Sequence, residues 1–299
     1  MVLTLQSNIV IFGVARMATV EISIITSGNI PWSFKRDIEN IFRDCYRRFG
    51  SRIPYKVEIH VVDREANMRA LLKEDRVRLG MTTDGDDEFV CSHDAWRGYP
   101  RVICSLDRLT KLSKLGRLGA IRREAAHSVL HGSMEYYIFR IPDECRHTAT
   151  IKALEPAVLD QALYYVSVAV KDFEATRLLV QHGFIDCQFT YALEWLKPTE
   201  QQKSDWKLVQ TNRQTKFIYL TTLLRPMLFV HPLLALPKSK NIPLESQVQL
   251  ARRVEELLEH LGTTEQNRLL QVTSVIAADA TDDTHKNVDI AMCQAMNLA

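Results

Sequence analysis

Apolar positions in the first third of the chain follow two patterns. Runs rich in β-branched residues alternate with stretches in which apolar side chains recur at helical spacing. The predicted elements are strand 20–26, helix 34–49, strand 55–62, helix 64–73 and two short hairpin strands at 89–92 and 100–105. The order through residue 105 is therefore β-α-β-α-β-β.

Beyond residue 105 the pattern becomes helical. Long stretches of apolar residues recur every three or four positions, and glycines or prolines punctuate them. The predicted helices are 118–132, 155–182, 186–196, 217–236 and 244–261. The last forty residues show only a weak helical pattern, and we expect a loose tail there.

Residues 217–236 form an apolar run of membrane-spanning length. Arg225 lies near its middle, where an arginine costs roughly 2.5–3.5 kcal/mol on insertion scales. Pro226 and Pro232 interrupt the helical pattern. We therefore expect two buried helices broken at the prolines, with peripheral membrane contact as the weaker alternative.

These patterns predict an α+β fold, with a small mixed sheet and its helices at the N-terminal side and a helical C-terminal region. Residues 1–16 are expected to be a disordered extension, because a clean strand follows Met17 and translation could begin there. Residues 17–197 then form an α+β domain, and residues 198–299 form the helical C-terminal region.

Composition and charge narrow the function classes. The chain has 299 residues, with 38 Lys and Arg against 36 Asp and Glu, so its net charge is only +2. The basic stretch 108–123 lacks interleaved aromatic residues, and we do not expect a nucleic-acid partner. The six cysteines form no CxxC pair, which indicates reduced thiols in a cytoplasmic protein.

The segment 122–133, RREAAHSVLHGS, carries the candidate chemistry. His127 and His131 are four residues apart, so on a helix both imidazoles lie on one face, one turn apart. This is an arrangement in which two histidines bind one metal ion. Glu124 falls on the same stripe, and Gly132 can end the helix directly after the second histidine.

The motif HSVLH at 127–131 resembles the HExxH helix of zincin metallopeptidases, in particular the gluzincin and minigluzincin type. The resemblance implies a zincin-like core that binds Zn²⁺ through His127 and His131. In zincins a small mixed sheet precedes this helix and its edge strand lines the substrate cleft; here residues 100–105 take that place. The third ligand in gluzincins is an acidic residue on a later helix.

Residues 171–176, KDFEAT, are similar to the segment that carries this third ligand. Matching Ala175 to the alanine of the family places Asp172 in the ligand position. The apolar face of the predicted helix 155–182 instead centres closer to Glu174. Both residues remain candidates, with Glu174 slightly preferred.

Ser128 departs from the family pattern, because it stands where the general-base glutamate belongs. A serine hydroxyl has no pKa suited to that role, so hydrolytic activity is expected to be weak or lost. Glu124 could substitute as the base, or support a histidine instead. We thus predict a zincin-like metal-binding protein, either a weak metallopeptidase or a pseudoenzyme, with a peptide or protein as substrate or partner. The alternative is a non-enzymatic interaction protein whose histidine pair is structural.

Overall fold

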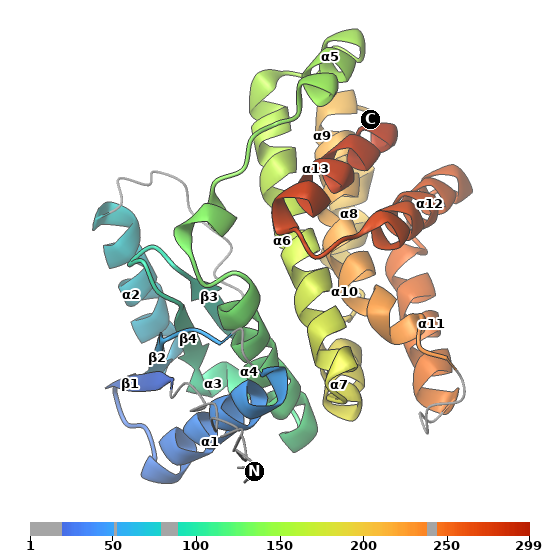
Figure 1. The fold of residues 1–299 in the computed structure, drawn as a ribbon. Helices are drawn as coiled ribbons and strands as arrows, with labels where there is room; N and C mark the ends of the chain where they lie inside the picture. Colours follow the sequence, from blue (N-terminus) through green and yellow to red (C-terminus); the bar gives the residue numbers. More distant parts are fainter. Residues whose placement is uncertain (1–19, 51–52, 79–88, 238–243) are drawn as a thin grey trace, which may run out of the picture.

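The computed structural model describes residues 20–50, 53–78, 89–237 and 244–299. Within them the chain has an α+β fold, as predicted: a mixed sheet with interleaved helices leads into a largely helical region (Figure 1). The sheet has four strands in the order β1-β2-β4-β3. They are β1 (Glu21–Ser27), β2 (Lys56–Val62), β3 (Cys91–Asp94) and β4 (Arg101–Ser105).

The two faces of the sheet are covered by different helices. The helices that accompany the strands are α1 (Trp32–Phe49), α2 (Glu65–Arg78), α3 (Leu106–Leu109) and α4 (Lys114–Leu130). Alternation along β2 sends Ile59 and Val61 into the main core beside α1 and α4. Val62, at the end of the same strand, packs with Met68 of α2 in a smaller apolar cluster.

The order of strands corrects one expectation drawn from the zincin resemblance. Residues 100–105 do not form the edge of the sheet, because β4 lies between β2, to which it is parallel, and β3, to which it is antiparallel. The edge strand next to β4 is β3. The hairpin itself is confirmed, with Cys91 opposite Cys104.

The remaining elements are helical and gather around one long helix. They are η1 (Met134–Tyr137), α5 (Asp143–Ile151), α6 (Pro156–Gln181), α7 (Ile185–Trp195), α8 (Glu200–Val209), α9 (Arg213–Thr222), α10 (Leu224–Leu234), α11 (Leu244–Leu258), α12 (Thr263–Asp279), α13 (Thr284–Ala295) and η2 (Met296–Leu298). In Figure 1, α6 runs between the part that holds the sheet and the later helices. It packs on α4, α10 and α13.

The apolar run 217–236 folds as parts of two helices, but they do not break at the prolines. The boundary is Leu223, which ends α9 and begins α10. Pro226 lies in the first turn of α10, where its missing N–H costs no helical hydrogen bond, and Pro232 lies inside that helix. One stretch, Arg213–Leu234, is long and apolar enough to cross a membrane, and 56% of its most apolar window is buried inside the protein.

The last forty residues are not a loose tail. They form α12, α13 and η2, and Val288, Met292 and Leu298 are fully or almost fully buried. One continuous core includes residues from both sides of position 197. The domain boundary at 197 stays a prediction. The proposed extension 1–16 and the start at Met17 lie outside the described residues.

Candidate metal site

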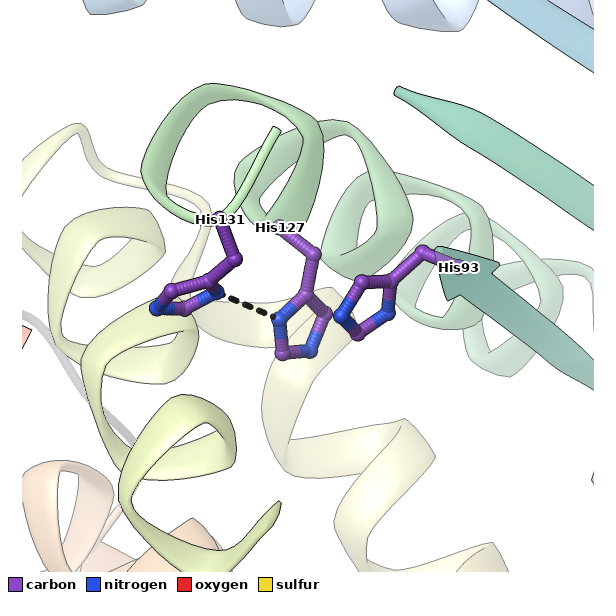
Figure 2. A group of neighbouring side chains, drawn as sticks. All are labelled: His93, His127 and His131. Atoms are coloured by element: carbon purple, nitrogen blue, oxygen red, sulfur yellow. Dashed lines mark hydrogen bonds between the residues drawn. The ribbon is translucent and has the colours of Figure 1, made fainter. Parts of the chain in front are cut away.

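Three histidines lie together where the edge of the sheet meets the end of α4. His127 lies in the last turn of α4, and His131 caps that helix, with its N–H donating to the His127 carbonyl oxygen at 2.7 Å. His93 comes from the edge strand β3 and points toward the same space (Figure 2). Gly132 permits the tight end of the helix, because a Cβ there would lie 2.3 Å from the Ser128 carbonyl oxygen.

The imidazoles are close enough to share one ion. One ligand atom from each of the three rings lies within 4.8 Å of the other two. The Nδ1 atoms of His127 and His131 are 3.1 Å apart, as the dashed line in Figure 2 marks. The rings of His93 and His127 are stacked, with centroids 3.8 Å apart and planes inclined by 12°.

Each of the three histidines has one ring nitrogen close to a carboxylate. Nδ1 of His93 lies 3.0 Å from Oε2 of Glu124, which is one turn before His127 on α4. Nε2 of His131 lies 2.8 Å from Oε2 of Glu174 on α6. Carboxylates in this position fix the orientation and tautomer of metal-binding histidines in other proteins.

Asp172, also on α6, is the third carboxylate, and it serves mainly as the partner of two arginines. Its Oδ1 pairs with Arg123 of α4, and its Oδ2 accepts from Nε of Arg225 of α10 at 2.7 Å. Oδ1 also lies 3.4 Å from Nε2 of His127, but the two atoms are not aligned for a hydrogen bond. The ion pairs hold Asp172 beside the cluster.

Glu174 is held from its far side by the last α-helix. The hydroxyl of Thr284 donates to Oε2 at 2.8 Å, and the amide of Asn287 donates to Oε1 at 2.5 Å. Both residues are buried and lie in the first turns of α13. The candidate site therefore includes residues from β3, α4, α6, α10 and α13.

Burial and charge set the protonation of the cluster. Burial lowers the pKa of His131 to about 4 and holds the pKa of His127 well below its usual range, so both rings are neutral at pH 7. Hydrogen bonding to His131 lowers the pKa of Glu174 against the effect of burial. Arg123 and Arg225 hold the pKa of Asp172 well below its usual range in the same way. Neutral imidazoles beside ionised carboxylates are the state in which histidines bind metals.

Unsatisfied polar atoms concentrate at this site. Seven buried side-chain nitrogen or oxygen atoms in the described residues lack a hydrogen-bond partner. Four of them belong to His93 (Nε2), Arg123 (Nε), His127 (Nε2) and Tyr137 (Oη), whose ring is 6.3 Å from that of His93. An unmade hydrogen bond on a buried group costs about 1–3 kcal/mol, so a bound ion or water molecule would be stabilised at this cluster.

Ser128 does not face the histidine cluster. Its hydroxyl donates to the carbonyl oxygen of Ala125 at 2.7 Å and accepts from the hydroxyl of Tyr46 on α1, also at 2.7 Å. Both side chains are buried, so the contact connects α1 to α4 inside the core. The residue at the expected general-base position thus occupies a hydrogen bond between two helices.

The structure brings the sequence-predicted residues together and adds others. His127, His131, Glu124, Asp172 and Glu174 all lie in one buried cluster. Sequence reasoning missed His93, Arg123, Arg225, Thr284 and Asn287. A signal for His93 existed, because it directly follows a predicted strand of the hairpin that precedes α4, but nothing in its local pattern marks it as a ligand.

Comparisons with known proteins add no name to this site. No family model matches the chain, and no curated protein or solved structure matches it either. What the structure shows is a group of three buried or partly buried histidines, His93, His127 and His131, that could hold a metal ion.

Proposed function

We propose that the protein binds one zinc ion through His93, His127 and His131. The observation that carries this proposal is the closeness of three imidazoles, whose ligand atoms lie within 4.8 Å of one another, each with a buried carboxylate beside it. Imidazole nitrogen is a preferred ligand of Zn²⁺, and three histidines leave a fourth coordination position open. His93 would then supply the third ligand, with Glu174 and Asp172 supporting the other two rings.

The distance between His127 and His131 suits such an ion. Two nitrogens bound to tetrahedral zinc at 2.0–2.1 Å lie about 3.4 Å apart. The Nδ1 atoms of His127 and His131 are already 3.1 Å apart. The rings of His93 and His127 are stacked, and the lone pair of each nitrogen lies in the plane of its ring. One of these rings therefore has to turn before all three histidines can bind the same ion.

The charge of the cluster also favours a divalent cation. Among the described residues, Glu124 and Glu174 form no ion pair with a lysine or arginine, although both are buried. Asp172, by contrast, has two arginine partners. A buried carboxylate without a cation is costly, and a doubly charged ion bound to the histidines would offset two of them.

Hydrolytic activity would be weak or absent in this zincin-like protein. A zinc ion with an open position can polarise a carbonyl group and acidify a bound water molecule. The chain, however, offers no free base at the position of Ser128, whose hydroxyl is bound to Ala125 and Tyr46. Glu124 is occupied by His93, which supports a role in holding that ring over a role as general base.

The alternative, an interaction protein with structural histidines, has less support. His131 is satisfied without a metal, since both of its nitrogens have partners. Nε2 of His93 and Nε2 of His127 are not satisfied. A purely structural cluster would leave these two buried nitrogens without a hydrogen bond from any described residue.

Metal content measured by mass spectrometry tests the proposal. We expect about one zinc per chain in the purified protein and none in a His127→Ala/His131→Ala variant. His93→Ala distinguishes two ligand sets. A site made of the three histidines loses its zinc in this variant, whereas a site made of His127, His131 and Glu174 keeps it. His147→Ala, at an exposed position on α5, is the matched control and should keep the ion. Absence of metal from the native protein after zinc is supplied would refute the proposal.

A further inference from the structure

We propose that metal binding moves the ring proton of His127 from Nδ1 to Nε2, so that His127 and His131 both hold the ion through Nδ1. This inference rests on the proposed function, since it concerns the same site. It follows from counting the protons that the hydrogen bonds of the cluster require.

The proton on His131 is fixed by Glu174. An ionised carboxylate only accepts hydrogen bonds, so Nε2 of His131, 2.8 Å from Oε2, must carry the proton. Thr284 and Asn287 both donate to the same carboxylate, which keeps Glu174 ionised and in place. Because the ring is neutral, Nδ1 of His131 has a free lone pair.

The proton on His127 follows from that lone pair. The two Nδ1 atoms are 3.1 Å apart, and His131 can only accept there, so Nδ1 of His127 must donate. Its Nε2 then has no proton. That nitrogen lies 3.4 Å from Oδ1 of Asp172 without a hydrogen bond, so an unprotonated nitrogen and a carboxylate oxygen lie side by side in a buried place. Without metal, the hydrogen bond to His131 therefore requires the proton on Nδ1 of His127, whereas the carboxylate of Asp172 favours a proton on Nε2.

A metal ion between the two Nδ1 atoms removes this conflict. Both nitrogens must then be free of protons, and a neutral His127 carries its proton on Nε2 instead. The relocated N–H then lies beside Oδ1 of Asp172, 3.4 Å from the ring nitrogen, and a small turn of the ring would let it donate to this oxygen, which Arg123 and Arg225 keep ionised. The total number of protons on the ring is unchanged. The Nδ1–H bond breaks by giving its proton to water, and the Nε2–H bond forms by taking a proton from water.

His93 completes the set without any change of tautomer. Its Nδ1 donates to Glu124 at 3.0 Å, and its Nε2 has no partner. The predicted ligand atoms are therefore Nδ1 of His127, Nδ1 of His131 and Nε2 of His93. Asn287 and Thr284 act as positioning residues, because they touch Glu174 and reach the ion only through His131.

Nitrogen-detected tautomers of the histidine rings test the inference directly. The full-length protein is labelled with ¹⁵N-histidine, and long-range ¹H–¹⁵N spectra are recorded without metal and with one equivalent of zinc. The nine histidines are assigned with single His→Ala variants. We expect His131 to keep its proton on Nε2 in both states, and His127 to change from Nδ1–H to Nε2–H on zinc binding.

Two results would overturn the inference while leaving the proposed function intact. One is zinc bound with His127 still protonated on Nδ1, and the other is a metal-free His127 already protonated on Nε2. Zinc content is measured in the same samples, so a protein that takes up no zinc is recognised separately and rejects both proposals.

Asn287→Ala tests the positioning role with a second measurement. Loss of a group that supports a ligating histidine typically lowers metal affinity about 10- to 100-fold. We expect that loss, together with a mixture of His131 tautomers in the nitrogen spectra, in a protein that still folds. Asn297→Ala, at an exposed position after α13, is the control and should change neither. An Asn287→Ala protein with unchanged affinity and a single His131 tautomer would contradict the role.

Discussion

Nε2 of His131 lies 2.8 Å from Oε2 of Glu174, although 43 residues separate them in the chain. This contact connects the end of α4 to the middle of α6, and it is buried on both sides. A hydrogen bond to a charged group in such a setting is worth about 1.5–3 kcal/mol. It also determines which nitrogen of His131 is available to a ligand.

Replacing Glu174 with glutamine should weaken zinc binding about 10- to 100-fold. The amide keeps the shape of the side chain but removes the charge that fixes the proton on His131, and its NH₂ group meets the donors of Thr284 and Asn287. Competition with a zinc-binding dye measures the affinity. Glu135→Gln, an exposed glutamate in η1, should behave as the native protein does. Equal affinity in the two variants would show that Glu174 does not support His131.

Replacing Asp172 with asparagine should chiefly affect folding. The change leaves Arg123 and Arg225 without their shared anion, and breaking a buried ion pair in this way costs about 3–5 kcal/mol. Urea unfolding followed by circular dichroism measures the loss. Asp160→Asn changes an exposed aspartate of the same helix and should cost almost nothing. A similar small cost for Asp172→Asn would mean that the two arginines find other partners.

Replacing Ser128 with alanine should lower stability without changing zinc content. The buried hydroxyl of Tyr46 loses its partner, which costs about 1–3 kcal/mol. Ser204→Ala, on the exposed side of α8, is the matched control. A fall in zinc content with Ser128→Ala would indicate that the serine acts at the metal after all.

Ser128→Glu should not create a peptidase. The new carboxylate would point toward Tyr46 on α1 and away from the three histidines, where it is both buried and unpaired. We expect a destabilised protein without zinc-dependent hydrolysis of a quenched fluorescent peptide library. Turnover that disappears with chelator and in the His127→Ala/His131→Ala background would contradict this expectation.

Zinc should stabilise the native protein, and a chelator should reverse the effect. Free zinc at 100 times its dissociation constant adds about 2.7 kcal/mol to the free energy of unfolding, provided that the unfolded chain does not bind it. Differential scanning calorimetry at several zinc concentrations measures the shift. The His127→Ala/His131→Ala variant should show none, and a shift of equal size there would place the zinc elsewhere.

Much of the fold could be predicted because it depends on local patterns. Strands and helices of the first 105 residues follow from apolar spacing, and the long helix α6 matches its predicted range closely. The prediction of an edge strand at 100–105 was wrong because strand order depends on pairing across the sheet, which local sequence does not encode. The weak pattern of α12 and α13 has a different cause, because each buries a single stripe that includes polar or small residues such as Thr273, Thr284 and Asn287.

The candidate site was predictable only in part, for a similar reason. His127 and His131 share a helical turn, so their spacing is visible in the sequence. Glu174 could be singled out by the face of α6 on which it lies. His93, Arg225 and Asn287 reach the cluster from three other elements, and only tertiary packing brings them there.

The contact between α13 and Glu174 has a consequence for the timing of synthesis. His93, His127 and His131 are synthesised well before Asn287. At about 5–20 residues per second, the interval between residues 131 and 287 lasts roughly 8–30 s. During this interval the three histidines are translated but Glu174 lacks its partners, so the nascent chain would carry an unfinished site. The full support of His131 through Glu174 would therefore form only after residue 287 has been synthesised and α13 has docked.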